Sequence, residues 1–300
     1  MMDLSSEQLR TLATVVATGT FEAAAAELRL TPSAVSQRIR QLERSAGTVL
    51  LRRTKPATTT ESGDVLLRLA REFAALSADA ERELGGLPGG GGPARVRVAV
   101  AVNADSLATW FGAALAEIAD DPGLELEVMR EDEGLSAEHL RSGRAMAAVT
   151  RSAHPVQGCS AAYLGTLEYR AMAAPGFAER WFGRAASGGA HPLAAAPVVH
   201  FDRSDPLQRD VVRRFAGPDA APPSHHVPDS VLFVGAISQG LGWGMVPAAQ
   251  DPGDGSLVAL DAAWTHPVRL FWQRWKIDTP ALSRVSAAVE RAASAGLARR

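Results

Sequence analysis

The chain has 300 residues, of which 46% are hydrophobic, and its formal net charge at pH 7 is −2. This length is sufficient for two or three folded domains, and the charge excludes a protein that is basic over its whole surface. The single cysteine, Cys159, excludes an intramolecular disulfide, and no apolar run reaches the roughly 18 residues of a membrane span.

These features favour a cytoplasmic protein that does not enter a membrane, since the N-terminus also lacks a basic lead followed by an apolar run. Positive charge is nevertheless concentrated at one end of the chain. Residues 1–60 contain eight Arg or Lys and five Asp or Glu, whereas the rest contains 23 and 28. The basic excess is therefore local, and it directs attention to the N-terminal segment.

Two short helices are predicted in this segment. The stretch "TGTFEAAAAELRL" predicts the first, and Thr31 followed by Pro32 marks the start of the second, because a capping hydroxyl precedes a proline at the first helical position. The second helix is predicted to run through Glu43. Its apolar stripe consists of Val35, Ile39 and Leu42. Two helices joined by such a short link indicate a helix-turn-helix.

A second face of the predicted helix carries hydroxyl, amide and guanidinium groups, from Ser33, Ser36, Gln37 and Arg40. Such groups suit base edges and phosphates, although most polar helix faces are merely solvated. The surrounding composition favours DNA, since residues 29–55 include seven basic residues and a single acid. Three of these basic residues follow the apolar "TVLL", where a short strand would begin a wing along the phosphate backbone: Arg52, Arg53 and Lys55.

The first 65 residues resemble the LysR-type transcriptional regulators. The matching segments are, in order, "LRTLATVVATGTFEAAAAEL", "TPSAVSQRIRQLE", "G", "LLRRT" and "TTTESGDVLL". The resemblance implies a winged helix-turn-helix over residues 1–60 that binds double-stranded promoter DNA and contacts RNA polymerase. The residues that it places in the DNA groove are Pro32, Ser33, Ala34, Ser36 and Gln37, with Arg53 in the wing. At Leu50-Leu51-Arg52 the family commonly has Leu-Phe and a variable residue, which is a conservative departure.

Residues 60–84 predict a long amphipathic helix that begins at a capping Thr60. Its apolar residues are Val65, Leu66, Leu69, Phe73 and Leu76. Such a stripe needs an apolar partner, which is either the core of the same chain or, as the resemblance implies, the same helix of a second copy. The resemblance implies a linker helix over 61–88 and a homodimer that assembles to a homotetramer. We expect a hinge over 89–94, where "GLPGGGGP" ends the helical pattern.

The second half, residues 95–300, alternates between apolar strands and helical patterns. The predicted strands are "RVRVAVAV" (95–102), "LELEVM" (124–129), "AMAAVT" (145–150), "APVVHF" (196–201) and "WGMVP" (243–247), and "DPLQRDVVRRF" (205–215) is a predicted helix. Strands that alternate with helices indicate an α/β sheet domain.

The second half contains no recognisable catalytic or cofactor motif. The stretch "GLGWGM" lacks the strand-to-helix setting of a dinucleotide loop, and neither a P-loop nor a G-x-S-x-G elbow occurs. The histidines are scattered, and His225-His226 does not have the spacing of a metal site. We therefore expect no cofactor, no metal and no enzyme activity. A small-molecule enzyme fused to a DNA-binding tail is the weaker hypothesis.

Polar residues at three strand ends predict a ligand site. The candidates are Asn103, Asp105 and Ser106 at the first strand end, Glu131 and Glu133 in "REDEG", and Asp202 in "VVHFDRSD". The first group begins a helix whose free amides favour a carboxylate, unless the three side chains simply cap that helix. The acidic groups favour a cation. An amino acid with a positive side chain fits this polarity, with its carboxylate at Ser106 and its ammonium groups at the acids.

The segments "VNADSLATWF", "APVVHFD", "QGLGWGMVP" and "LFWQRW" resemble the ArgP/LysG branch of the LysR family. This resemblance implies that the chain senses lysine, arginine or histidine and controls basic amino acid export. It also implies an effector domain similar to a periplasmic binding protein, with lobe I at 95–166 and 268–300, lobe II at 167–267 and the ligand between them. Ligand-dependent closure would then change the spacing of the recognition helices. A regulator of the same architecture with a different small-molecule effector is the alternative.

Overall fold

The computed structural model describes residues 4–52, 54–84, 96–130, 136–183 and 191–299. Backbone contacts divide the chain into two compact units. Unit 1 consists of Met1–Val102, Ile118–Ala162 and Trp272–Ala287, and unit 2 of Asn103–Glu117, Tyr163–Phe271 and Ala288–Arg300. This division assigns 103–117 and 288–300 to unit 2, whereas the predicted lobes group both segments with lobe I. The predicted hinge, 89–94, lies outside the described residues.

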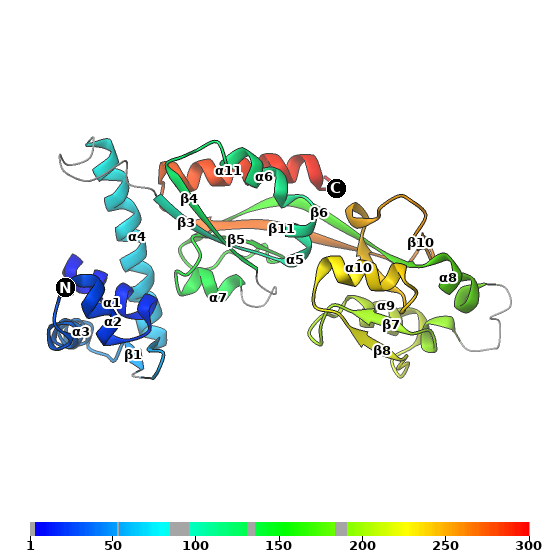
Figure 1. The fold of residues 1–300 in the computed structure, drawn as a ribbon, viewed down its shortest axis with the longest axis horizontal. Coiled ribbons are helices and arrows are strands. Elements are labelled where there is room, and N and C mark those ends of the chain that lie inside the picture. The colour runs from blue at the N-terminus through cyan, green and yellow to red at the C-terminus, as the bar shows by residue number, and fades with distance from the viewer. Residues whose placement is uncertain (1–3, 53, 85–95, 131–135, 184–190, 300) are drawn as a thin grey trace. The chain divides into compact units, whose positions relative to one another are not determined.

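Three helices and a two-stranded wing form the N-terminal part of unit 1 (Figure 1). The helices are α1 (Ser6–Thr18), α2 (Phe21–Leu28) and α3 (Pro32–Ala46). The Oγ1 of Thr31 accepts a hydrogen bond from the amide of Ala34 at 3.2 Å, which caps α3 as its sequence predicts. Strand β1 (Leu51–Arg52) pairs antiparallel with β2 (Thr58–Thr59). The predicted helix-turn-helix and its wing are therefore confirmed.

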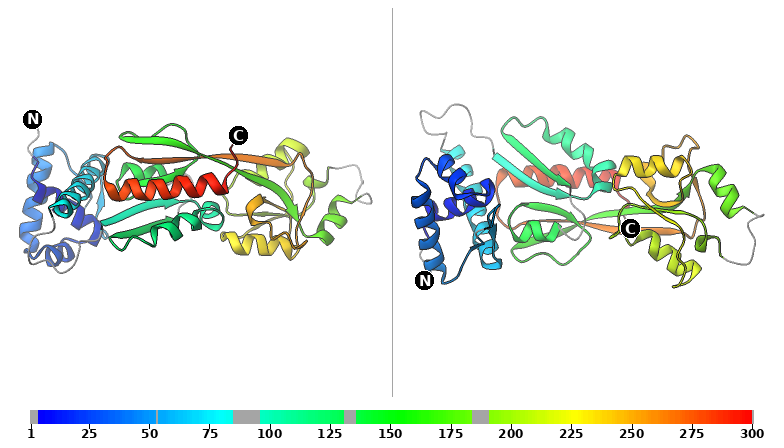
Figure 2. Two further views of the ribbon diagram at one scale, coloured as in Figure 1. Left: turned by 90° about the horizontal axis from the view of Figure 1, so that it is seen from above. Right: turned by 60° about the horizontal axis from the view of Figure 1, so that its bottom comes forward.

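The apolar stripe of α3 holds this part together. Val35, Ile39 and Leu42 are at most 1% exposed and lie in one core with side chains of α1, α2, the wing and the next helix. Complete burial of such a side chain contributes roughly 1.5–3 kcal/mol to the free energy of unfolding. Figure 2 shows α1, α2 and α3 packed together, in blue. The opposite face of α3 consequently points outward.

The linker helix α4 (Glu61–Glu83) has two different apolar faces. Its start is fixed by Thr60, whose Oγ1 accepts from the amide of Gly63 at 3.1 Å. Leu66 and Leu67 are buried in the N-terminal core. A second set remains exposed, namely Val65, Leu69, Phe73 and Leu76. Leu66, which the sequence groups with these four residues on one stripe, is instead buried, because the first turns of α4 pack against the N-terminal core.

Three parallel strands form the central part of unit 1. β3 (Val96–Val102) lies between β4 (Leu124–Arg130) and β5 (Ala147–Thr150). The end of β11 (Thr265–Trp275) lies beside β5, where the amide of Trp275 donates to the carbonyl of Met146 at 3.0 Å. Helix α7 (Ser136–Arg141) precedes β5, and α11 (Pro280–Gly296) follows β11. β3 is mostly buried, as a central parallel strand is expected to be.

Unit 2 combines antiparallel and parallel pairs. β6 (Cys159–Ala173) pairs antiparallel with β9 (Gly244–Pro247) and β10 (Val258–Ala259), and β7 (Val198–His200) pairs parallel with β8 (Ser224–His226). Its α-helices include α5 (Ala104–Ala108), α6 (Phe111–Ile118), α8 (Pro175–Phe182), α9 (Leu207–Ala216) and α10 (Ser230–Ser238), and α11 enters the unit at Ala288. The 3₁₀ turns are η2 (Pro192–Ala194) and η3 (Ala248–Gln250).

The five predicted strands of the second half are confirmed as β3, β4, β5, β7 and β9, and the predicted helix as α9. The sequence patterns did not indicate β6 and β11. Among the strands of the described ranges, these two have residues in both units.

Candidate functional sites

The outward face of α3 carries the polar groups that its sequence predicts. Pro32, Ser33, Gln37 and Arg40 are exposed, and Ala34 and Ser36 are partly buried. The apolar stripe on the opposite side fixes this orientation. An amide can bond an adenine edge, and a guanidinium can bond a guanine edge or a phosphate. The arrangement therefore gathers on one surface groups that are able to bond base edges and phosphates.

Glu43, the single acid within the basic segment, makes hydrogen bonds inside the N-terminal domain. Its Oε1 accepts hydrogen bonds from the amides of Leu50 and Leu51 at 3.0 and 3.4 Å. These bonds join α3 to the first strand of the wing. The carboxylate thereby serves to position the wing beside the recognition helix.

The wing and the end of α3 supply further exposed cations. Arg52 and Lys55 are exposed, and Arg53 lies outside the described residues. Arg44 is also exposed, four residues beyond Arg40 and seven beyond Gln37, so it continues the same face. Sequence reasoning missed Arg44, although the helical period that selected Gln37 and Arg40 extends to it.

Asn103, Asp105 and Ser106 meet at the start of α5, in unit 2. The Oδ1 of Asn103 accepts from the amide of Ser106 at 3.1 Å, which caps this short helix. The carboxylate of Asp105 accepts from the hydroxyls of Tyr169 at 2.6 Å and Ser230 at 3.2 Å. Asp105 therefore connects α5 to β6 and α10. Neither hydroxyl partner was predictable from the sequence, since only the tertiary fold brings these residues together.

Ser106 is completely buried. Its Oγ has no hydrogen-bond partner among the described residues. A buried hydroxyl without a partner is energetically costly, which makes this atom a candidate for bonding a ligand.

Asp202 lies in the loop after β7, also in unit 2. Its Oδ1 accepts from the amide and the hydroxyl of Ser204, both at 2.6 Å, and from the amide of Asp205 at 2.9 Å. Partial burial by itself raises the pKa of the Asp202 carboxyl, but these hydrogen bonds outweigh burial and hold the pKa below its usual range. Asp202 is thus kept ionised, as an anion that attracts cations must be.

A histidine pair lies beside this loop. His200 is 6% exposed and stacks on His226, with ring centroids 5.4 Å apart, because β7 and β8 pair in register at these positions. Burial lowers the pKa of His200, Asp205 opposes this effect, and His226 and Arg209 add to it. The sequence analysis singled out His226 but not His200, because strand pairing alone brings the two rings together.

The remaining candidates, Glu131 and Glu133, lie outside the described residues. Within the described part of the chain, no group of three or more His, Cys, Asp or Glu side chains is placed to hold a metal ion. The same part contains no helix that is both long enough and apolar enough to cross a bilayer.

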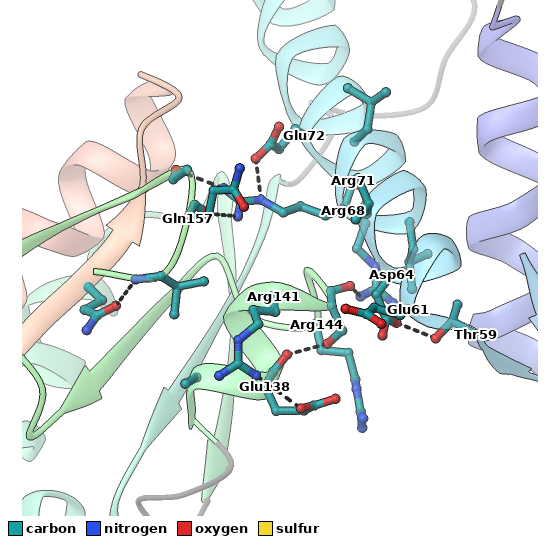
Figure 3. Close-up of a pocket in the computed structure, with 18 of the residues that line it drawn as sticks. Thr59, Glu61, Asp64, Arg68, Arg71, Glu72, Glu138, Arg141, Arg144 and Gln157 are labelled. Carbon is teal, nitrogen blue, oxygen red and sulfur yellow. Dashed lines mark hydrogen bonds and ion pairs between the residues drawn. The ribbon is translucent and has the colours of Figure 1, made fainter. Parts of the chain in front are cut away.

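Unit 1 contains a cleft of about 2140 Å³ that the sequence did not predict (Figure 3). It lies between α4 and the wing on one side and α7 with the segment 150–158 on the other. Much of its lining is charged, from Arg52, Glu61, Asp64, Arg68, Arg71, Glu72, Glu138, Arg141, Arg144, Arg151 and Lys276.

Two family patterns match most of the chain. Residues 6–64 match the bacterial regulatory helix-turn-helix protein, lysR family, and residues 90–294 match the LysR substrate binding domain. The chain is 42% identical to the HTH-type transcriptional regulator LysG of Mycobacterium tuberculosis, over 99% of this chain and 95% of that protein. It is 38% identical to the lysine export transcriptional regulatory protein LysG of Corynebacterium glutamicum, over 97% and 98%.

Solved structures agree with these matches. Full-length LysG from Corynebacterium glutamicum with bound effector arginine has a TM-score of 0.83 and 36% identity, covering 99% of this chain and 100% of that one. ArgP from Mycobacterium tuberculosis has a TM-score of 0.89 and 40% identity, with the same coverage. The predicted fold class, a winged helix-turn-helix with a linker helix and a two-lobed α/β effector domain, is confirmed. The relatives are regulators rather than enzymes, and this chain belongs to the LysR family of bacterial helix-turn-helix transcriptional regulators.

Proposed function

We propose that this regulator senses a free basic amino acid, arginine or lysine, and controls genes for its export or metabolism. The observation that carries the proposal is the likeness to the LysG structure with bound arginine, which extends over 99% of this chain. The name of the Corynebacterium glutamicum relative, a lysine export regulator, supports the same class of ligand.

The DNA-binding role belongs to the outward face of α3 and to the wing. Ser33, Gln37 and Arg40 supply groups for base edges and phosphates, and Arg52 and Lys55 supply cations beside them. We assign Pro32, Ala34, Ser36 and Arg53 to the same interface. The target is double-stranded promoter DNA in the cytoplasm, where the regulator also contacts RNA polymerase.

The exposed face of α4 supports dimerisation. Val65, Leu69, Phe73 and Leu76 recur at helical spacing and are each at least 39% exposed in the single chain. An apolar stripe of this kind is stabilised when a second helix covers it. Two copies joined through α4 place two recognition helices on one operator, and pairing of dimers gives the tetramer.

The effector role belongs to the polar residues of unit 2. Ser106 offers a buried hydroxyl without a partner, suited to a carboxylate oxygen. Asp202 offers an ionised carboxylate for an ammonium or guanidinium group. Asn103 and Asp105 hold α5 in place through their hydrogen bonds, and we assign Glu131 and Glu133 as further partners of the cation.

Isothermal titration of the full-length protein tests this assignment. Arginine, lysine and histidine should be compared with citrulline, which has the shape of arginine without its side-chain charge. Binding of a basic amino acid, with citrulline weaker by tenfold or more, is expected since one unpaired charge costs at least about 1.4 kcal/mol. A wild type that binds none of the three at millimolar concentration would refute the effector claim.

The variant Asp202→Asn tests the placement of the cation. It keeps the size of the side chain and removes its charge, so affinity for arginine and lysine should fall while folding persists. Asp219→Asn, at an exposed acid of the same unit, is the matched control. Undiminished binding by Asp202→Asn would refute this placement and leave the effector class standing.

A further inference from the structure

Arg68 extends from α4 across the cleft of unit 1 (Figure 3). Its Nη1 donates to the carbonyl of Gln157, and its Nη2 donates to the carbonyl of Gly158 at 2.9 Å. Its Nε donates at 2.8 Å to Glu72, one turn further along α4, which aims the guanidinium. The Arg68 side chain is only 13% exposed. Arg68 is therefore built into the fold, unlike a solvated surface cation.

The contacts of Arg68 lie at the ends of two particular strands. Gln157 and Gly158 immediately precede β6. The carbonyl of Gly158 also accepts at 3.1 Å from the amide of Lys276, the residue after β11. The guanidinium lies over the ring of Trp275, the last residue of β11, 5.8 Å from its centroid. Both β6 and β11 have residues in both units, so Arg68 of α4 contacts the residues that lead into β6 and the last residue of β11 at once.

A second arginine of α4, three residues after Arg68, also bonds the neighbouring part of unit 1. Arg71 donates at 3.2 Å to the carbonyl of Ser142, just beyond the C-terminal end of α7, where helix carbonyls are negative. Gly143 allows the approach, because a Cβ at this position would lie 2.8 Å from the Cα of Arg68. Its φ of +72° also favours glycine. The backbone of α4 at Arg68 thus lies close against the turn that follows α7, which limits independent movement of the two segments.

We propose that Arg68 couples effector binding to DNA binding, by transmitting changes in β6 and β11 to the linker helix α4. The inference rests on the proposed function and adds the route of regulation. A change in unit 2 reaches Gly158 and Trp275 along the two strands and shifts the guanidinium that contacts both. Leu66 and Leu67 of α4 lie in the same core as Val35 and Ile39 of α3, so a shift of α4 moves the recognition helix.

The test compares full-length wild type with Arg68→Ala and with Arg141→Ala. Arg141 belongs to the same cleft but pairs with Glu138 on its own helix, so it controls for loss of one arginine (Figure 3). The Kd for an operator selected from random DNA is measured by fluorescence anisotropy with and without saturating arginine. The Kd for arginine is measured by isothermal titration.

Allosteric coupling commonly changes affinity by roughly 5- to 150-fold, and wild type and Arg141→Ala should fall in this range. Arg68→Ala should bind arginine and operator separately, but arginine should change its operator Kd by less than about twofold. If arginine changes the operator Kd of Arg68→Ala by the same factor as that of the wild type, the proposal is overturned.

If Arg68→Ala does not fold, Arg68→Lys replaces it in the same experiment. Lysine keeps the charge and the apolar stem, but it lacks the planar fork that bonds two carbonyls and Glu72 together. Arginine should change the operator Kd of this variant by less than about twofold as well, while its circular dichroism stays that of the wild type. If the factor equals that of the wild type, the proposal is overturned. A wild type that binds no basic amino acid is recognised by the titration alone and overturns the proposed function together with this coupling.

Discussion

At the scale of single residues, Gln37 is the group whose role follows most directly from its position. It is exposed at the centre of the outward face of α3, while Val35 and Ile39 on either side of it in sequence are buried. Gln37→Ala should reduce discrimination between operator and unrelated DNA by about 1–3 kcal/mol, the contribution of one base contact. Competition binding assays measure this difference. Thr48→Ala, just past the end of α3, should leave discrimination unchanged, and an equal loss there would refute the assignment.

His200 should make the stability of the protein depend on pH. Burial lowers its pKa in the folded state, whereas the unfolded chain has the ordinary value near 6.5. Between these two values the unfolded chain binds more protons. The stabilisation that is present above about pH 6.5 is therefore lost as pH falls through the folded-state pKa.

The Tm of wild type should accordingly decrease between pH 7.5 and 5.5, and the decrease should be smaller in His200→Gln. The charged groups that act on His200 are Asp205, His226 and Arg209. His154→Gln, at an exposed histidine, should keep the wild-type slope. Identical slopes in wild type and His200→Gln would show that burial of His200 does not control this titration.

The predictability of individual residues depends on how local their signal is. Ser33, Gln37 and Arg40 were identified from helical period within a single helix, and the structure exposes all three. The contacts of Asp105 with Tyr169 and Ser230 were not predictable, because residues far apart in sequence form them. The same reason explains why His200, the stacked partner of His226, was not identified.

At the scale of elements, α4 has a buried and an exposed apolar face. Leu67 is 1% exposed within the N-terminal core, whereas Leu69 is 39% exposed on the other face. Leu69→Glu should therefore leave the monomer folded but place a charge in the proposed dimer contact, so light scattering should report a smaller mass.

Leu67→Ala is the matched contrast. It should lower the free energy of unfolding by roughly 2–5 kcal/mol, because it leaves a cavity in the core. An unchanged mass for Leu69→Glu, with native circular dichroism, would show that this face of α4 does not form the dimer.

Helices and short buried strands were predictable because their periodicity or apolar character is visible within a few residues. The long strands β6 and β11 were not identified. Each mixes exposed and buried positions along its length, because its environment changes between the ends. An irregular burial pattern gives neither a clean alternation nor an apolar run. The two strands whose ends lie at Arg68 were thus among the elements that the sequence did not indicate.

At the scale of the whole molecule, the family and the DNA-binding role were predictable, since the helix-turn-helix pattern and the linker are contiguous in sequence. For the proposed ligand site, the sequence indicated only which charges a ligand would need. Asn103, Asp105 and Ser106 are together at α5, and Asp202 is in the loop after β7. Whether these groups hold one ligand depends on tertiary geometry that strand-end residues alone do not determine.

The most direct test of the central claim is operator binding by the wild-type protein in the presence of arginine, lysine or citrulline. Fluorescence anisotropy with a selected operator gives the Kd in each case, and DNase footprinting on the same DNA gives the length protected. The account predicts that arginine or lysine changes the Kd or the footprint and that citrulline, without the side-chain charge, does not. An operator complex that responds identically to all three, or to none, would contradict it.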